Sequence, residues 1–272
     1  MRRLVVLLGA VLLVAGCGGG GALSFDPAAS AANTSKAGSA KVIFATSVAG
    51  AGKPLHMNGL GSVDFDSKAA SMTFAVGDLL RGSGVPVSPG EQWTILTQGL
   101  VVYMHAPTLS RQLPGGKPWL KLDVAQLAKS RNANLGQFRE LTQNDPTQML
   151  AYLKATSGNI EKVGIEDVRG VSTTHYRAKV DLAKVADQAP ANVRKAYRTS
   201  IVALEDSLGT DKLPVDVWID KDNLVRRFSE HLKVPGSGNI DFSVDFYDFG
   251  TPVTITTPPP SETLDLGQVL GG

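Results

Sequence analysis

Hydrophobic and polar residues alternate with a period of two along most of the chain. In the segment SMTFAV, Met72 and Phe74 fall on one side of a strand, and the small or polar residues between them fall on the other. The segment DFSVDFYDF places Phe242, Val244 and Phe246 on one side in the same way. This pattern predicts roughly ten or eleven half-buried antiparallel strands in meander order. The expected strands are 41–48, 56–66, 71–76, 91–97, 99–105, 118–122, 159–168, 171–180, 213–220, 223–233 and 241–249.

Three segments follow the helical period instead. Residues 123–130 start with Asp123 as the N-cap, and the segment NDPTQMLAYLKATSG has Asp145 as its N-cap and Gly158 as its stop signal. The longest helix is expected at 191–208, where apolar residues recur at steps of three and four. These residues are Val193, Tyr197, Ile201, Leu204 and Leu208. An α+β fold, with the helices on the concave face of a curved antiparallel sheet, buries every apolar stripe.

The N-terminus carries a secretion signal. Arg2 and Arg3 precede an apolar run of about 12 residues, which is too short to cross the ~30 Å hydrocarbon core of a bilayer as a helix. The run ends in the letters VAGC, which are similar to the lipobox of bacterial lipoproteins and predict cleavage before Cys17. Cys17 would then carry diacylglycerol. Because it is the only cysteine, a disulfide within the chain is excluded, and the alternative is a free thiol.

The predicted domain organisation follows from these observations. Residues 1–16 are expected to be a lipoprotein signal peptide, and residues 17–40, rich in Gly, Ala and Ser, a flexible tether. Residues 41–257 are expected to form one domain, and residues 258–272 a C-terminal tail. No second apolar run is long enough to span a bilayer, so we expect a body held by lipid on the extracytoplasmic face of the cell membrane.

The charge of the mature protein argues against two classes of partner. Removing residues 1–16 takes away Arg2 and Arg3 and no acidic residue, so that 27 basic residues become 25 and equal the 25 acidic ones. Nucleic acids and anionic lipid surfaces both bind proteins through an excess of positive charge. We therefore expect no nucleic-acid partner and a membrane contact that depends on the lipid anchor.

The residue types that carry catalysis or bind metals show no recognisable spacing. His56, His105, His175 and His231 lie far from one another in the sequence, and none is spaced from a second ligand as in zinc sites. Each is expected to be a surface or strand-face residue. The chain also lacks G-x-S-x-G and S-x-x-K motifs with their companions. We therefore predict no catalytic site, no metal site and no cofactor.

Carboxylates along the predicted strands offer an alternative that the sequence favours less. Glu161, Glu166, Asp216 and Asp220 alternate with other residues, and nothing in the sequence brings two of them together. We interpret them as a solvated face of the sheet. A hydrolase of envelope polymers is the enzymatic hypothesis that they would support.

Three segments are similar to the LppX/LprG group of actinobacterial lipoproteins and, more remotely, to the LolA/LolB carriers. These segments are GKPWLKLD, VGIEDVRGVSTTHYRAKVDLAKV and LPVDVWIDKDNLVRRF. The resemblance covers most of residues 40–250 and implies an unclosed half-barrel of antiparallel strands covered by helices. It also implies a hydrophobic cavity for the acyl chains of a lipid or lipoglycan. Thr174, His175 and Tyr176 match the hairpin of the group and are expected to support strand packing.

The expected function is therefore that of a membrane-anchored lipoprotein that binds or carries acyl chains at the cell envelope. An envelope sensor or scaffold with a filled core remains the alternative, because periodicity does not distinguish a cavity lining from a dry core. An envelope transporter is a possible further partner, whose identity the sequence does not give. The predicted cavity lining consists of Phe65, Met72, Phe74, Ile95, Met149, Leu153, Tyr197, Ile201, Leu204, Val217, Phe242, Val244 and Phe246.

Overall fold

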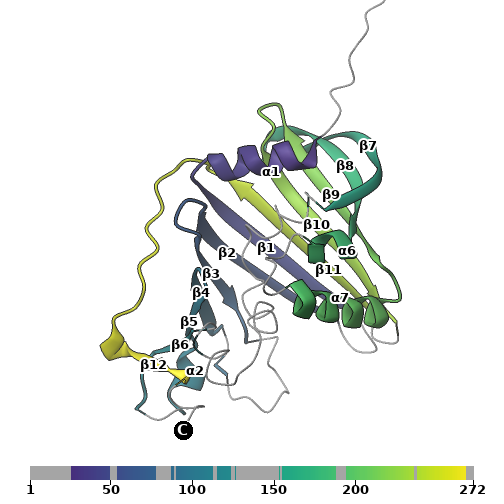
Figure 1. Cartoon of the computed structure of the whole chain (residues 1–272). Helices are drawn as coiled ribbons and strands as arrows, with labels where there is room; N and C mark the ends of the chain where they lie inside the picture. Colours follow the sequence, from purple (N-terminus) through teal and green to yellow (C-terminus); the bar gives the residue numbers. More distant parts are fainter. Residues whose placement is uncertain are drawn as a thin grey trace, which may run out of the picture.

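The computed structural model describes most of the domain predicted from the sequence (Figure 1). The described residues are 26–49, 54–77, 87–88, 90–112, 115–123, 126, 153, 155–187, 194–235 and 238–267. The predicted secretion signal and Cys17 lie outside them, as do most of the helices expected at 123–130 and 144–158.

One large sheet of 12 strands forms the frame of the described part. The strands are β1 (Ser39–Ala49), β2 (Leu55–Asp64), β3 (Ala69–Ala75), β4 (Gln92–Gln98), β5 (Val101–His105), β6 (Trp119–Asp123), β7 (Thr156–Val168), β8 (Val171–Asp181), β9 (Lys212–Asp220), β10 (Val225–Val234), β11 (Gly238–Tyr247) and β12 (Thr263–Asp265). Their order across the sheet is β12-β6-β5-β4-β3-β2-β1-β11-β10-β9-β8-β7. The sheet is not closed, so the expected half-barrel of mostly antiparallel strands with an α+β composition is confirmed.

Two meanders meet at the centre of the sheet. Strands β1 to β6 follow one another on one side, β7 to β11 follow one another on the other, and β1 pairs with β11. The turns between neighbouring strands include Lys68, Arg169 and Asn223, which adopt positive φ. Because the length and type of a turn fix the register of its hairpin, these turns set which side chains share a face.

The C-terminal segment corrects the prediction of a tail at residues 258–272. After a short 3₁₀ helix, η2 (Pro260–Glu262), β12 adds to the edge of the sheet and pairs with β6 in parallel, not antiparallel, direction. Lys121 and Asp265 form an ion pair of 3.0 Å across this pairing. A three-residue strand that pairs with a distant segment carries no periodic signal of its own, which is why the pattern missed it.

The predicted flexible tether is wrong over residues 27–36, which form helix α1 (Pro27–Lys36). The Asp26 side chain caps it by accepting hydrogen bonds from the backbone N–H groups of Ala28 and Ala29. Ala31 is 1% exposed in the core, so α1 gains its stability from packing. The small residues that suggested a linker allow the helix to approach the sheet closely.

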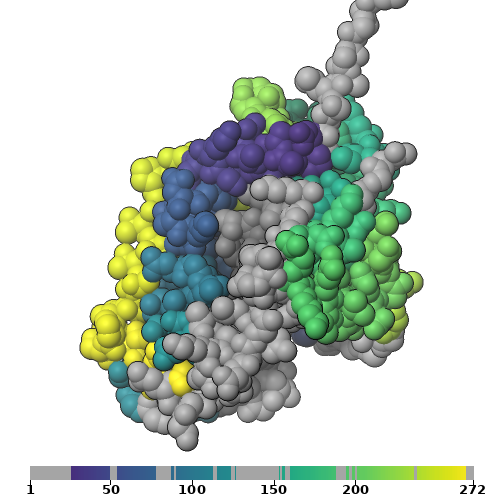
Figure 2. Space-filling view, in the orientation of Figure 1, coloured from purple at the N-terminus to yellow at the C-terminus, as the bar shows by residue number. Residues whose placement is uncertain are grey.

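Other helices lie on one face of the sheet together with α1. They are α6 (Leu182–Asp187) and α7 (Arg194–Leu208), which confirms the helix expected at 191–208, whereas α6 was not expected. Figure 2 shows α1 in purple and α7 in green on the same side of the molecule. A short helix, α2 (Pro107–Ser110), follows β5. The helix stop expected at Gly158 is wrong, because β7 already begins at Thr156.

Candidate functional site

The strand register separates two faces of the sheet that differ in chemistry. The inner face is the one covered by the helices, because its side chains form one hydrophobic cluster with Ala31 of α1, Leu182 of α6 and Leu208 of α7. On β1 to β6 and β8 to β11 the inner positions are apolar residues, glycine, serine, threonine and Tyr176. Apart from the bulge residue Arg226, these ten strands carry one charged residue on the inner face, Glu230.

The inner face is only partly covered. Phe228, Val217 and Val244 are at most 1% exposed, so the middle of the face is packed. In the next row across the sheet, Met57 and Phe242 are only partly buried. A partly accessible apolar surface on the concave side of the sheet is the kind of surface that an acyl chain can cover.

The predicted lining residues fall into three groups. Those in the hydrophobic cluster are Phe65, Met72, Leu153, Val217, Val244 and Phe246, all buried, and Phe74, Ile201 and Phe242, which are partly buried and pack against it. Ile95 is partly buried on β4, and Leu204 on α7 is 38% exposed. Met149 and the side chain of Tyr197 lie outside the described part. The residues in the cluster do share one face, and whether they line a ligand cavity stays a prediction.

Two cavities are lined by described residues, and neither contains a predicted lining residue. One, of about 850 Å³, lies between the β7–β8 hairpin, the β9–β10 turn and Asp26 at the start of α1. The other, of about 560 Å³, lies against α7 beside Arg198 and Val202.

Glu230 has no hydrogen-bond partner among the described residues. Its neighbours across the strands are Val215 and Phe242, and its neighbours along β10 on the same face are Phe228 and Leu232. Burial among these apolar groups raises the pKa of Glu230 to about 7. The residue as a whole is only partly buried. This residue was missed in the sequence, although the alternation Phe228-Glu230-Leu232 places it on the apolar side of its strand.

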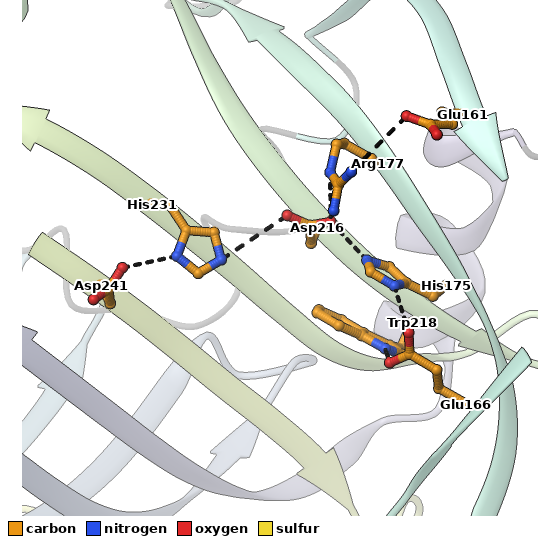
Figure 3. A network of polar contacts seen from close by, with 8 residues as sticks. All are labelled: Glu161, Glu166, His175, Arg177, Asp216, Trp218, His231 and Asp241. Carbon is orange, nitrogen blue, oxygen red and sulfur yellow. Dashed lines mark hydrogen bonds and ion pairs between the residues drawn. The ribbon is translucent and has the colours of Figure 1, made fainter. Parts of the chain in front are cut away.

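The outer face holds a network of charged side chains that the sequence interpretation missed (Figure 3). His175 Nδ1 lies 2.9 Å from Glu166 Oε1, and His175 Nε2 lies 2.6 Å from Asp216 Oδ1. Arg177 donates to Asp216 from Nε at 3.2 Å. His175 and Asp216 are 6% and 5% exposed. His175 is thus a strand-face residue, as expected, whereas the expected solvated position of Asp216 is wrong.

Trp218 joins the same network from the neighbouring strand. Its ring stacks on His175 with a centroid distance of 4.2 Å and an interplanar angle of 13°. Its indole N–H donates to Glu166 Oε2 at 2.7 Å, and this bond, with that of His175, lowers the pKa of Glu166. On the other side, Arg227 lies 5.6 Å from the Trp218 ring and forms a bidentate pair with Asp245. Side chains of neighbouring strands thus pack on one another on the outer face.

Asp220 is the second carboxylate whose predicted solvation is wrong, since it is 7% exposed. It accepts hydrogen bonds from the backbone N–H groups of Asp222 and Leu224 at 2.9 Å each and from Arg226 Nε at 2.6 Å. These contacts hold the β9–β10 turn, where Asn223 accepts a hydrogen bond from Ser30 of α1. Asp220 therefore positions α1 on the sheet.

The geometry of the outer network favours a structural role. Ionised carboxylates only accept hydrogen bonds, so both contacts of His175 are hydrogen bonds only when its ring carries two protons. In that arrangement His175 has no free nitrogen with which to accept a proton from a substrate. Among the described residues no group of three or more His, Cys, Asp or Glu side chains could hold a metal ion. No helix in the described part is long and apolar enough to cross a bilayer.

Comparison with known proteins gives distant similarities. No family model matches the chain. An uncharacterized 31.2 kDa protein in the rplA-rplJ intergenic region of Streptomyces griseus is 30% identical over 159 residues, which are 57% of this chain and 50% of that protein. The aligned part therefore spans half the length of this relative.

Solved structures of similar architecture cover most of the chain. The lipoprotein LppX of Mycobacterium tuberculosis matches 85% of this chain and 98% of its own, with 16% identity and a TM-score of 0.45. LprF of Mycobacterium bovis matches 85% and 96%, with 15% identity and a TM-score of 0.40. A LolA superfamily protein of Nitrosomonas europaea matches 85% and 96%, with 7% identity and a TM-score of 0.33. The structural neighbours thus include LppX, LprF and a LolA superfamily protein.

Proposed function

We propose that this protein is a lipid-anchored protein of the cell envelope that binds or carries the acyl chains of a lipid or lipoglycan against its inner face. The observation that supports this most directly is the apolar inner face, which stays partly accessible at Met57, Phe74 and Phe242. Burying an acyl chain is favourable by about 0.8 kcal/mol per methylene, so a chain of ordinary length would be held firmly on such a surface.

The anchor that we propose is a lipid on Cys17. Eight residues separate Cys17 from Asp26, where α1 is capped. A chain of that length reaches at most about 30 Å, much less than the tether to residue 40 that the composition suggested. The N-terminal end of α1 would therefore stay close to the membrane surface, within reach of lipids that leave the bilayer.

The direct test of the proposal is native mass spectrometry of the protein without its signal and anchor, purified from its own host. We expect a bound lipid whose mass is lost on extraction with organic solvent. Protein that is repeatedly ligand-free, and that takes up no neutral fluorescent acyl probe, would instead support a sensor or scaffold with a filled core.

The anchor is tested separately by Cys17→Ala. We expect the variant to move from the membrane fraction to the medium, because one acyl-bearing residue supplies the membrane affinity that we propose. Fractionation and immunoblotting measure this, with Ser24→Ala in the same segment as a matched control. Membrane retention of Cys17→Ala equal to that of the control would contradict the anchor and leave the acyl-binding proposal standing.

A further inference from the structure

Glu230 stands out because of where the sheet register places it. Its row across the inner face runs Met57, Thr46, Phe242, Glu230 and Val215. Both neighbouring rows are also free of charge: Phe228 precedes it and Leu232 follows it on the same strand. A carboxyl group at this position costs folding free energy unless a partner satisfies it.

The described part of the chain supplies no such partner. By contrast, the acidic residues on the outer face of β9 and β11 are all paired: Asp216, Asp220 and Asp245 each accept a hydrogen bond from an arginine side chain, and Asp241 contacts the His231 ring. Glu230 accepts none from the described residues, yet it is only partly buried on the apolar inner face. A ligand bound against this face would therefore lie within reach of an acid that the described residues leave unpaired.

We propose that Glu230 is a specificity-determining residue that hydrogen-bonds an oxygen carried along the acyl ligand, such as a chain hydroxyl or an internal ester. This inference rests on the proposed function and names the class of lipid: acyl chains with a polar oxygen part of the way along, in preference to plain hydrocarbon chains. An apolar cleft with one hydrogen-bonding group rejects a ligand that leaves this group unpaired.

The proposed hydrogen bond to an ester oxygen requires Glu230 in its neutral, protonated form. As a protonated acid, Glu230 donates one hydrogen bond and accepts others, which suits both a hydroxyl and an ester oxygen. Since its pKa lies at about 7, neutral and ionised forms interchange near physiological pH. From β9 and β11 only apolar side chains face it, as Asp216, Asp241 and Asp245 lie on the outer face. On α7, which lies over β10, the partly buried charged residues are Arg194 and Glu205.

The test compares neutral ligands that differ in one oxygen. Methyl stearate and a panel of methyl hydroxystearates, with the hydroxyl at positions 2, 3, 10 and 12, compete with a neutral pyrene-labelled acyl probe at pH 6. We expect at least one hydroxylated ester to bind about tenfold more tightly than methyl stearate, as one hydrogen bond to an otherwise unpaired buried group allows. Glu230→Leu should abolish the preference while still binding methyl stearate, and Glu230→Gln should keep it.

The pH dependence gives a second readout. Between pH 6 and pH 8 the wild-type protein should lose about tenfold in affinity for methyl stearate, because ionised Glu230 disfavours an apolar chain. Glu230→Gln should show no such loss, whereas Glu161→Gln, a matched change on the exposed edge strand, should behave like the wild type.

The outcomes separate this inference from the proposed function. If methyl stearate binds and no hydroxylated ester binds more tightly, or if Glu230→Leu keeps the preference, the role of Glu230 is overturned and acyl binding stands. If no ester displaces the probe, or the probe itself does not bind, the proposed function fails together with the inference.

Discussion

The two faces of the sheet differ in whether their acidic side chains have hydrogen-bond partners, even at neighbouring positions. Asp216 on β9 points outward, where His175 and Arg177 donate hydrogen bonds to it. The residue before it, Val215, points inward and lies opposite Glu230, which has no partner in the described part of the chain. Both acids are largely surrounded by protein, but only Asp216 accepts hydrogen bonds from described side chains.

This difference shows that hydrogen-bond donors and burial shift the pKa of a carboxyl group in opposite directions. On the outer face, hydrogen bonds from Trp218 and His175 lower the pKa of Glu166. On the inner face, burial without a donor raises the pKa of Glu230 to about 7. The acids on the outer face thus stabilise the fold. The acid on the inner face destabilises it when ionised, and we propose that it hydrogen-bonds a ligand.

Removing a hydrogen-bonded acid from the outer face should have the largest effect on the free energy of unfolding. Asp216→Ala leaves the buried His175 and the guanidinium of Arg177 without their shared acceptor. We expect the free energy of unfolding to fall by about 3–5 kcal/mol, the cost of breaking a buried ion pair from one side. Urea unfolding followed by tryptophan fluorescence and circular dichroism measures this. A loss below about 1 kcal/mol would mean that the network is not coupled to folding.

Removing the unpaired acid Glu230 from the inner face should instead raise the free energy of unfolding, and only at higher pH. The unfolded chain ionises this group near pH 4.5, whereas the folded protein ionises it near pH 7. The wild type therefore keeps the full contribution of Glu230 below pH 4.5 and loses it as the pH rises toward 7. Between pH 4 and pH 8, Glu230→Gln should gain roughly 3 kcal/mol relative to the wild type.

Urea titrations of Glu230→Gln and the wild type across this pH range measure the effect, and Glu161→Gln serves as the control. Parallel pH profiles for Glu230→Gln and the wild type would show that Glu230 is solvated like an ordinary surface acid.

A substitution in the outer network that keeps the stacked ring should lower the free energy of unfolding by less. Trp218→Phe removes the indole N–H but keeps a ring to stack on His175. Loss of one hydrogen bond of this kind costs about 1 kcal/mol, so we expect a fall in unfolding free energy of that size. The pKa of Glu166 should also rise, because Trp218 is the largest contributor to its lowering. Carbon-detected NMR titration of the Glu166 carboxyl group measures this second effect, and an unchanged titration would exclude the indole as its donor.

The strands were predictable because alternation is a local signal. The eleven expected strands correspond to β1 to β11 within a few residues at each end, and the turns at Lys68, Arg169 and Asn223 lie where Gly, Asp, Asn and Lys cluster. Helix α1 was missed because its Ala and Ser residues look like a linker, although Asp26 followed by Pro27 is a capping signal. Such a helix forms only because it packs on the sheet, which no local pattern reports.

The outer network was missed for a different reason. His175 and Glu166 are nine residues apart in one hairpin, so the turn at Arg169 and Gly170 already brings their strands together. His175 and Asp216 are 41 residues apart, and their contact depends on β8 pairing with β9. The sequence alone fixes neither that pairing nor its register. Glu230, in contrast, was readable as an acid at an apolar position of a predicted strand.

The smallest change in unfolding free energy should come from the exposed edge of the same network, where the acid has a hydrogen-bond partner but is not buried. Asp241 accepts a hydrogen bond from His231 Nδ1 at 2.8 Å, and the two side chains are 51% and 56% exposed. Water solvates both groups when the contact breaks, so Asp241→Ala should cost less than about 1 kcal/mol. When the His231 ring is protonated, salt screens such a pair, so the difference from the wild type should then vanish in 1 M NaCl, whereas the loss in Asp216→Ala should persist. A loss in Asp241→Ala as large as that in Asp216→Ala would mean that pairing alone, without burial, sets the contribution of an acid on this face.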